Sequence, residues 1–318
     1  MPSAFPLLRR RGAFFKQNHR LIVNNNMNAF TIKDLENLSG VKAHTIRIWE
    51  QRYSFLKPQR TKTNIRYYSC EELKAILNIA LLNKYGFKIS HIDRMCSKEM
   101  HEKLISLSHV QAQQERLLNE MLHFMVDLDM YQFEQLLNQQ IAIRGIDKTI
   151  TQLIFPFLDK IGILWIANNI NPAQEHLVTN IIRQKLMAGI ECCNPDYCIE
   201  KAAILFLPEG EHHELGLLYI NYLLKKHGVS VLYLGANVPL KDVVFVANLK
   251  KPEFLYTHLT CIADNFNLGK YLTQVSKALP ATSLVLSGNL THSYHRKVPA
   301  NVQLKRSLGQ MVEFVHGL

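Results

Sequence analysis

The stretch Phe30–Tyr53, FTIKDLENLSGVKAHTIRIWEQRY, predicts two short helices joined by a tight turn. Thr31, with the acid Asp34 three residues later, is typical of a capping box that opens a helix. Ser39-Gly40 then breaks this helix, and a second helix is predicted over about 43–53. Two helices and a glycine-containing turn within so short a stretch indicate a helix-turn-helix.

The residues that follow predict a small β-wing and two further helices. A basic segment runs into Ile65-Arg66-Tyr67-Tyr68, and helices are expected over about 70–85 and 89–97. Trp49 follows the apolar stripe of the second helix, so we expect it in the core. The residues expected to contact base edges or phosphates are Lys42, His44, Thr45 and Arg47 on the second helix, with Arg60, Lys62, Arg66 and Tyr68 on the wing.

This succession of helix, turn, helix and basic wing closely resembles the winged helix-turn-helix domain of the MerR family of transcriptional regulators. The resemblance covers residues 29–98 and rests on FTIKDLENLSGVKAHTIRIWEQRY and the wing ending RYYS. It implies that double-stranded operator DNA is a partner.

The charge of the chain is unevenly distributed. Residues 1–100 hold 18 lysines and arginines against seven acids, whereas residues 101–318 hold 19 of each. The whole excess of +11 therefore lies in the first third, as expected of a nucleic-acid-binding domain joined to neutral partners. Residues 1–28, rich in arginine and free of acids, are expected to form a basic flexible arm.

Composition excludes several classes of protein. The hydrophobic content of 47% and charged content of 20% argue against a largely disordered chain. No apolar run approaches the ~18–20 residues of a membrane span, so we expect no membrane contact and a cytoplasmic location. Cys192, Cys193 and Cys198 cluster, but no fourth ligand accompanies them at a finger-like spacing, which favours reduced thiols over structural zinc.

The remainder predicts two more domains. Helical periodicity over 108–195, with breaks near 127–129, 145–147 and 168–172, indicates a four-helix bundle. From 200 to 318, apolar runs alternate with helical segments. This alternation predicts a doubly wound parallel α/β domain of about five strands, so the fold class is multidomain, α and α/β.

The segment Glu211-His212-His213-Glu214-Leu215-Gly216 comes directly after the first predicted strand of the α/β domain. Open α/β sheets bind ligands at the carboxyl ends of their strands. A neutral histidine there can ligate a metal through one ring nitrogen while a carboxylate binds the other. The spacing of Glu211 and His213 supplies both groups, and Gly216 allows close approach of a ligand.

This segment is similar to the DxHxxG signature of cobalamin-binding domains, with Glu211 in the place of the Asp. The resemblance implies that His213 is the lower axial ligand of cobalt. It also implies that Thr257 stands in the turn that lines the nucleotide tail of the cofactor. Ser287 and Gly288 fall where the family usually has two glycines, a departure that crowds this tail pocket.

In the bundle, Trp165 is followed after nine residues by Glu175-His176. This pattern resembles that of the light-sensing adenosylcobalamin repressors of the CarH and LitR group. The resemblance implies that these side chains cover the upper face of the corrin and its adenosyl group. Members of the group carry a histidine directly after the tryptophan, which becomes an axial ligand after illumination. Here that position is Ile166.

The function these motifs predict is a transcriptional regulator, most simply a repressor, and not an enzyme. By the resemblance it binds operator DNA in the dark as an adenosylcobalamin-bound tetramer and releases it when light breaks the cobalt–carbon bond. One alternative is a regulator that uses another tetrapyrrole or no cofactor, which Ile166 and Ser287 would suit. A corrinoid methyl-carrier protein is the other, although it does not account for the basic domain.

Overall fold

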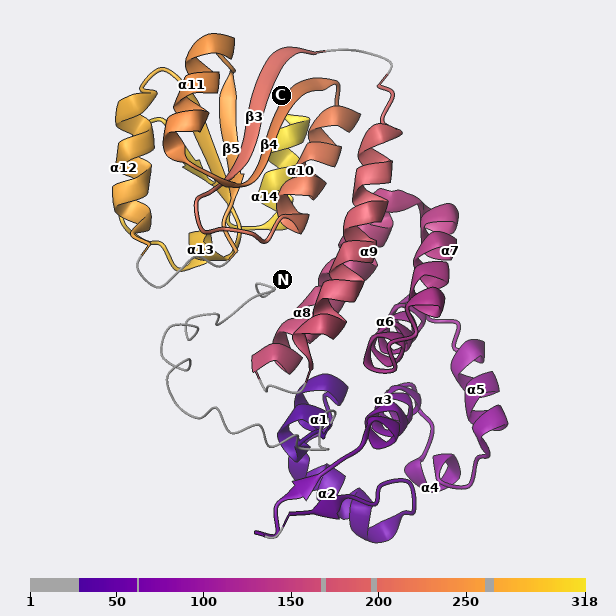
Figure 1. Cartoon of the computed structure of the whole chain (residues 1–318). Helices are drawn as coiled ribbons and strands as arrows, with labels where there is room; N and C mark the ends of the chain where they lie inside the picture. Colours follow the sequence, from indigo (N-terminus) through magenta and orange to yellow (C-terminus); the bar gives the residue numbers. More distant parts are fainter. Residues whose placement is uncertain (1–28, 62, 167–169, 196–198, 261–265) are drawn as a thin grey trace. The chain divides into compact units, whose positions relative to one another are not determined.

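The computed structural model describes residues 29–61, 63–166, 170–195, 199–260 and 266–318 (Figure 1). These residues form two compact units, one reaching to Asn180 and the other beginning at Ile181. In the parts of the chain that are described, no helix is both long and apolar enough to cross a lipid bilayer.

The first unit begins with the predicted helix-turn-helix. Its helices are α1 (Ile32–Ser39) and α2 (Ala43–Arg52), and the wing strands β1 (Gln59–Arg60) and β2 (Arg66–Tyr67) pair antiparallel. The capping box is confirmed, because the Asp34 carboxylate accepts from the backbone N–H of Thr31 at 2.6 Å. Gly40 ends α1 with φ of 75°, a left-handed conformation that glycine adopts without strain.

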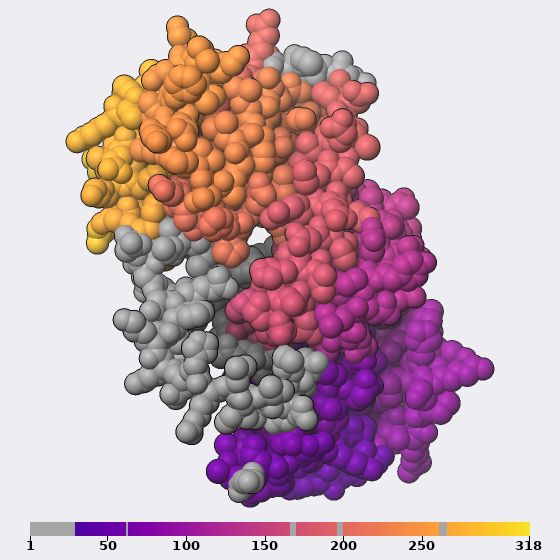
Figure 2. All heavy atoms as spheres, viewed as in Figure 1, coloured from indigo at the N-terminus to yellow at the C-terminus, as the bar shows by residue number. Residues whose placement is uncertain are grey.

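Helix α3 (Cys70–Lys84) confirms one prediction, but the helix expected over 89–97 is wrong in extent. The chain instead forms α4 (Ile89–Ile92) and α5 (Ser97–Ser106). They are separate because Cys96 is extended and acts as the N-cap of α5, its thiol accepting from the N–H of Glu99. The side chains of α1 to α5 pack into one continuous body, coloured indigo to purple in Figure 2.

The middle of the chain is helical, as predicted. It consists of α6 (Val110–Val126), α7 (Met130–Thr149), the π-helical segment η1 (Ile150–Ile154), α8 (Phe155–Ile166) and α9 (Pro172–Glu191). The π segment leads into Pro156, which has no N–H to offer the carbonyl of Gln152. The side-chain amide of Gln114 donates to that carbonyl instead. A side chain of the neighbouring helix α6 thus supplies the hydrogen bond that the carbonyl of Gln152 lacks in this irregular turn.

Helix α8 also joins the bundle to the helix-turn-helix. The Lys160 ammonium donates to the carbonyl oxygen of Leu38 at 3.3 Å, near the end of α1. Desolvation by burial lowers the pKa of Lys160. The same helix carries Trp165, five residues later.

The second unit contains the predicted five-stranded parallel sheet. Its strands are β3 (Ile199–Pro208), β4 (Val229–Val238), β5 (Phe254–His258), β6 (Ser283–Ser287) and β7 (Val302–Leu304), in the order β4-β3-β5-β6-β7. Helices α10 (Leu215–Lys226) and α14 (Leu308–His316) cover one face (Figure 1). Helices α11 (Leu240–Lys250) and α12 (Leu268–Ala278) cover the other, and the short α13 (Asn289–His292) follows β6.

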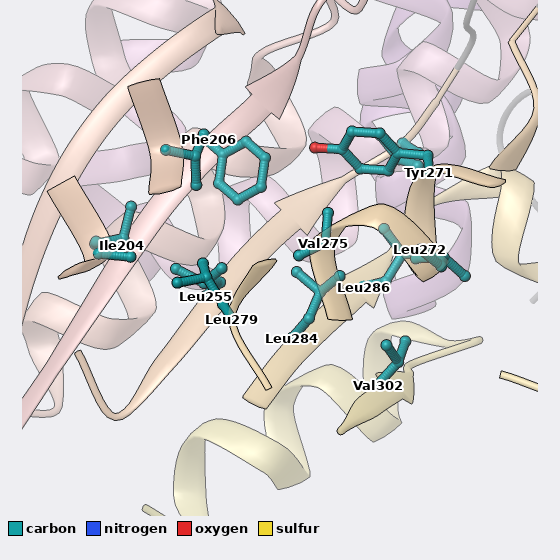
Figure 3. Close-up of a cluster of buried hydrophobic side chains, with 13 residues drawn as sticks. Ile204, Phe206, Leu255, Tyr271, Leu272, Val275, Leu279, Leu284, Leu286 and Val302 are labelled. Atoms are coloured by element: carbon teal, nitrogen blue, oxygen red, sulfur yellow. The ribbon is translucent and has the colours of Figure 1, made fainter. Parts of the chain in front are cut away.

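The core of this unit lies between the sheet and the pair α11 and α12. Figure 3 shows Leu255 of β5 and Leu284 and Leu286 of β6 facing Leu272 and Val275 of α12. Residue 257 lies between Leu255 and Leu259, which both belong to this cluster. Because side chains alternate along a strand, Thr257 shares the face of α11 and α12, and His258 points to the face of α10.

Candidate functional site

Glu211 organises the loop between β3 and α10. Its carboxylate is fully buried. One oxygen accepts from the backbone N–H groups of His212 and His213, both at 2.9 Å, and lies 2.6 Å from Nδ1 of the His213 ring. The other accepts from the N–H of Thr260 at 2.9 Å, from the loop after β5. This carboxylate thus ties two strand ends together.

The hydrogen bond to Glu211 determines what His213 offers to a ligand. A carboxylate only accepts, so the proton of the neutral ring lies on Nδ1 and the lone pair on Nε2. The side chain is 36% exposed, so Nε2 is not closed off by burial. A neutral imidazole whose other nitrogen is bound to a carboxylate is a good metal ligand.

Several residues that hold this loop carry no recognisable motif in the sequence. Asn237, at the end of β4, accepts from the N–H of Gly210 at 2.9 Å and donates its own N–H to the carbonyl of Glu211 at 3.1 Å. Tyr233 donates to Glu214 at 2.8 Å, and the guanidinium of Arg183 lies 3.6 Å from the same carboxylate. The loop is therefore positioned from β4 and α9 as well.

Gly216 lies in the first turn of α10, directly against the ring of His258. A Cβ atom at position 216 would collide with that imidazole. On its other side, Nδ1 of His258 is 2.7 Å from Oγ of Ser287. Thr257, which the resemblance places at the nucleotide tail, is fully buried on the opposite face of the sheet, and its neighbour His258 faces Gly216.

Gly288 has a packing role of its own. Its φ is 98°, and a Cβ there would collide with the backbone of Leu259. The N–H of Leu259 donates to the carbonyl of Ser287 at 2.8 Å. Gly288 thus allows the ends of β5 and β6 to approach closely, because a residue without a side chain tolerates both the positive φ and the nearby backbone.

The residues of this edge fit a cobalt ligand set. Glu211 and His213 supply the carboxylate-bound imidazole, and Gly216, without a side chain, has the ring of His258 packed against it. Among the described residues, no group of three or more histidines, cysteines or acids is placed to hold a metal ion. A single imidazole suits a metal whose other ligands come with its cofactor.

The predicted cap lies in the first unit. The indole N–H of Trp165, near the end of α8, donates to the carboxylate of Glu175 in the first turn of α9. Both side chains are partly buried, whereas His176 is exposed. The structure therefore brings Trp165 and Glu175 together. The side chain of Ile166 lies outside the described residues.

The predicted DNA contacts differ in exposure, and several have partners within the chain, such as Lys42, whose ammonium lies 3.5 Å from the carboxylate of Glu36. Lys42, His44 and Arg47 are exposed along α2, and Thr45 is partly buried. Arg60, also exposed, donates to Asn64 at 2.8 Å. Lys62 lies outside the described residues.

Two wing residues differ from the prediction. Tyr68 is fully buried beside Phe30, so it belongs to the core and does not reach a DNA backbone; the partly exposed tyrosine of this strand is Tyr67. Arg66 is partly buried and donates through Nε to both carboxylate oxygens of Glu50, at 3.0 and 2.9 Å. It fixes the wing to α2. Trp49 is buried, as predicted.

Comparisons with known proteins found family models that match two parts of the chain. Residues 30–99 match the family model described as MerR HTH family regulatory protein, and residues 117–188 match the one described as B12 binding domain. The chain is 28% identical over 269 residues to the HTH-type transcriptional repressor CarH of Myxococcus xanthus, covering 82% of this chain and 89% of CarH. To the repressor CarA of the same organism it is 28% identical over 210 residues, covering 65% of this chain and 68% of CarA.

Among solved structures, the monomethylamine corrinoid protein of Methanosarcina barkeri is similar with a TM-score of 0.49 and 14% identity. The match covers 64% of this chain and all of that one.

Proposed function

Because this chain is a MerR-family regulator with a B12-binding domain, related to the CarA and CarH repressors, we propose that it is a light-responsive repressor that holds adenosylcobalamin. The dark, cofactor-bound form assembles as a tetramer on operator DNA, and illumination releases the DNA. The observation that carries the proposal is the buried Glu211 carboxylate that holds Nδ1 of His213 and leaves Nε2 to ligate cobalt.

Each side chain has a separate task in this proposal. His213 holds the cobalt, and Glu211, bound to Nδ1, orients the ring so that Nε2 is left for the metal. Trp165 and Glu175, joined by their hydrogen bond, cover the adenosyl side. The bound cofactor would supply a cobalt–carbon bond that visible light breaks.

Assembly explains how a cofactor controls DNA binding. The exposed cations of α2 make few contacts in one copy, so one domain alone binds DNA weakly. Linked copies bind adjacent sites with a high effective concentration, and the gain disappears when the assembly separates. The size of the switch equals the differential affinity of the cofactor for the assembled form.

The test is an absorption spectrum of the full chain with adenosylcobalamin, in the dark and after green light, with size-exclusion chromatography and operator binding on both samples. We expect a bound corrin spectrum that changes on illumination, a large species that becomes smaller, and a loss of DNA binding. His213→Ala should abolish corrin binding. His212→Ala is the matched control, because this exposed neighbour contributes only its backbone N–H to Glu211.

Three results would contradict parts of the proposal. Corrin binding with no change of size would refute disassembly as the switch. Full operator binding by cofactor-free protein, unchanged by light, would favour a regulator without cofactor. Equal loss of corrin in both histidine variants would refute the role of His213.

A further inference from the structure

The imidazole of His258 fills a space that the fold has cleared at the carboxyl edge of the sheet. Gly216 offers no side chain on one side, and the ring packs against it closely enough that a Cβ would collide. Ser287 holds the ring on the other side, with 2.7 Å between Oγ and Nδ1. Ser287 is the residue that stands where cobalamin-binding domains usually have a glycine, so this departure is matched by a partner within the same chain.

The hydrogen bond that holds the His258 ring joins two neutral groups. Desolvation by burial lowers the pKa of His258 to about 4, so the ring is neutral at physiological pH. A neutral hydrogen bond to a hydroxyl adds only modest net stability, because water offers an equivalent partner. A rotation of the side chain would exchange that bond for one to solvent and leave an aromatic-sized slot.

The slot lies where a corrinoid held by His213 needs space. Gly216 is three residues beyond His213 in the chain, and Thr260, two residues beyond His258, donates to the carboxylate that holds His213. If His213 held the cobalt of a complete cobalamin, the nucleotide base of that cofactor, an aromatic group on a flexible tail, would need space elsewhere in the site.

We propose that His258 is a displaceable plug in the slot for the nucleotide tail, and that it makes the site discriminate against complete cobalamins relative to corrinoids that lack the tail. This inference rests on the proposed function. Ser287 sets how firmly the plug is held, since it binds the ring in its inward position.

The experiment compares adenosylcobalamin with adenosylcobinamide, which has the same corrin and adenosyl group but no nucleotide tail. Dissociation constants are measured in the dark by absorbance titration of the full chain and of His258→Ser. The ratio of the cobalamin constant to the cobinamide constant should fall by about tenfold in the variant, the equivalent of ~1.4 kcal/mol. The cobinamide constant itself should stay the same.

Two further variants keep the result interpretable. Ser287→Ala releases the ring without removing it, so the ratio should move in the same direction by a smaller factor. His292→Ser changes an exposed histidine of the same unit and should leave both constants unchanged. Thermal unfolding of the cofactor-free variants reports whether each one is folded.

The outcomes separate this inference from the proposed function. A ratio unchanged in His258→Ser and Ser287→Ala, with both corrinoids bound, overturns the plug and leaves the proposed function intact. Weaker binding of both corrinoids by the same factor assigns His258 a purely structural role and also overturns it. Failure of both corrinoids to bind wild-type protein overturns the proposed function and this inference together.

Discussion

Two glutamates each hold an aromatic ring in this chain, and they do so in different ways. Glu211 is fully buried and accepts from three backbone N–H groups as well as facing Nδ1 of His213. Glu175 is partly buried in the first turn of α9 and accepts from the indole of Trp165. The first carboxylate is part of the loop architecture, whereas the second joins two helix ends.

This difference shows how a sensor can combine a fixed and an adjustable contact. A ligand histidine held by a buried carboxylate is oriented before any cofactor arrives, which lowers the ordering cost of binding. A cap held between two helix ends can shift when its contact on the cofactor side changes. Under the proposed function, the fixed side would set the affinity for the cofactor and the adjustable side would carry the signal.

The largest expected effect tests the architectural role of Glu211. Glu211→Ala leaves buried N–H donors without an acceptor and should lower the free energy of unfolding of the second unit by about 3–5 kcal/mol. Glu175→Ala should cost about 1 kcal/mol in the first unit. Urea unfolding followed by circular dichroism measures both. Equal losses in the two variants would remove the contrast between the carboxylates.

The next effect is a loss of folding stability at acidic pH, which arises from the buried His258. The folded-state pKa of His258 is about 4 and the unfolded value about 6.5, so the unfolded chain binds the proton first on acidification. The contribution of His258 is complete above pH 6.5 and is lost as the pH falls to about 4, by up to about 3 kcal/mol.

Comparison with a variant isolates this contribution. Burial also lowers the pKa of His123 in the first unit to about 4, so the whole chain loses stability over the same range. Thermal unfolding from pH 7 to 4.5 should show a smaller loss in His258→Ser than in wild type. Parallel pH profiles for the two proteins would show that His258 takes up its proton equally in both states.

The smallest expected effect concerns the hydrogen bond between Trp165 and Glu175. Trp165→Phe keeps a flat ring but removes the donor to Glu175, at a cost of about 1 kcal/mol. Combined with Glu175→Ala, which removes the acceptor, in a double-mutant cycle, it should give a positive coupling energy that isolates this bond. Strict additivity of the two changes would mean that the indole and the carboxylate act independently.

Local chemistry made much of the fold predictable. The Thr31 capping box, the glycine after α1 and the five apolar strands each follow from side-chain type and spacing. The pairing of Glu211 with His213 was also predictable, because the two residues lie in one loop. Contacts between distant segments were not: Thr260, Asn237 and Arg183 reach the site from other elements.

Strand register explains the two predictions that moved by one residue. Side chains alternate across a strand, so a shift by one position exchanges buried and exposed faces. The wing tyrosine predicted to bind DNA is buried Tyr68. In β5, Thr257, expected at the nucleotide tail, is buried against α11 and α12, and His258 is the residue that faces Gly216. Only the packing of both sheet faces determines such a choice.

One helix connects the cap with the DNA-binding domain. Helix α8 carries Trp165 near its end and, five residues earlier, the Lys160 ammonium bound to the carbonyl of Leu38. Coupling between two binding sites is thermodynamically reciprocal. If this helix transmits the state of the cofactor to α1, then an operator duplex must tighten adenosylcobalamin binding by the same factor by which adenosylcobalamin tightens operator binding. Under the proposed function, operator DNA would then act as an effector of the cofactor site.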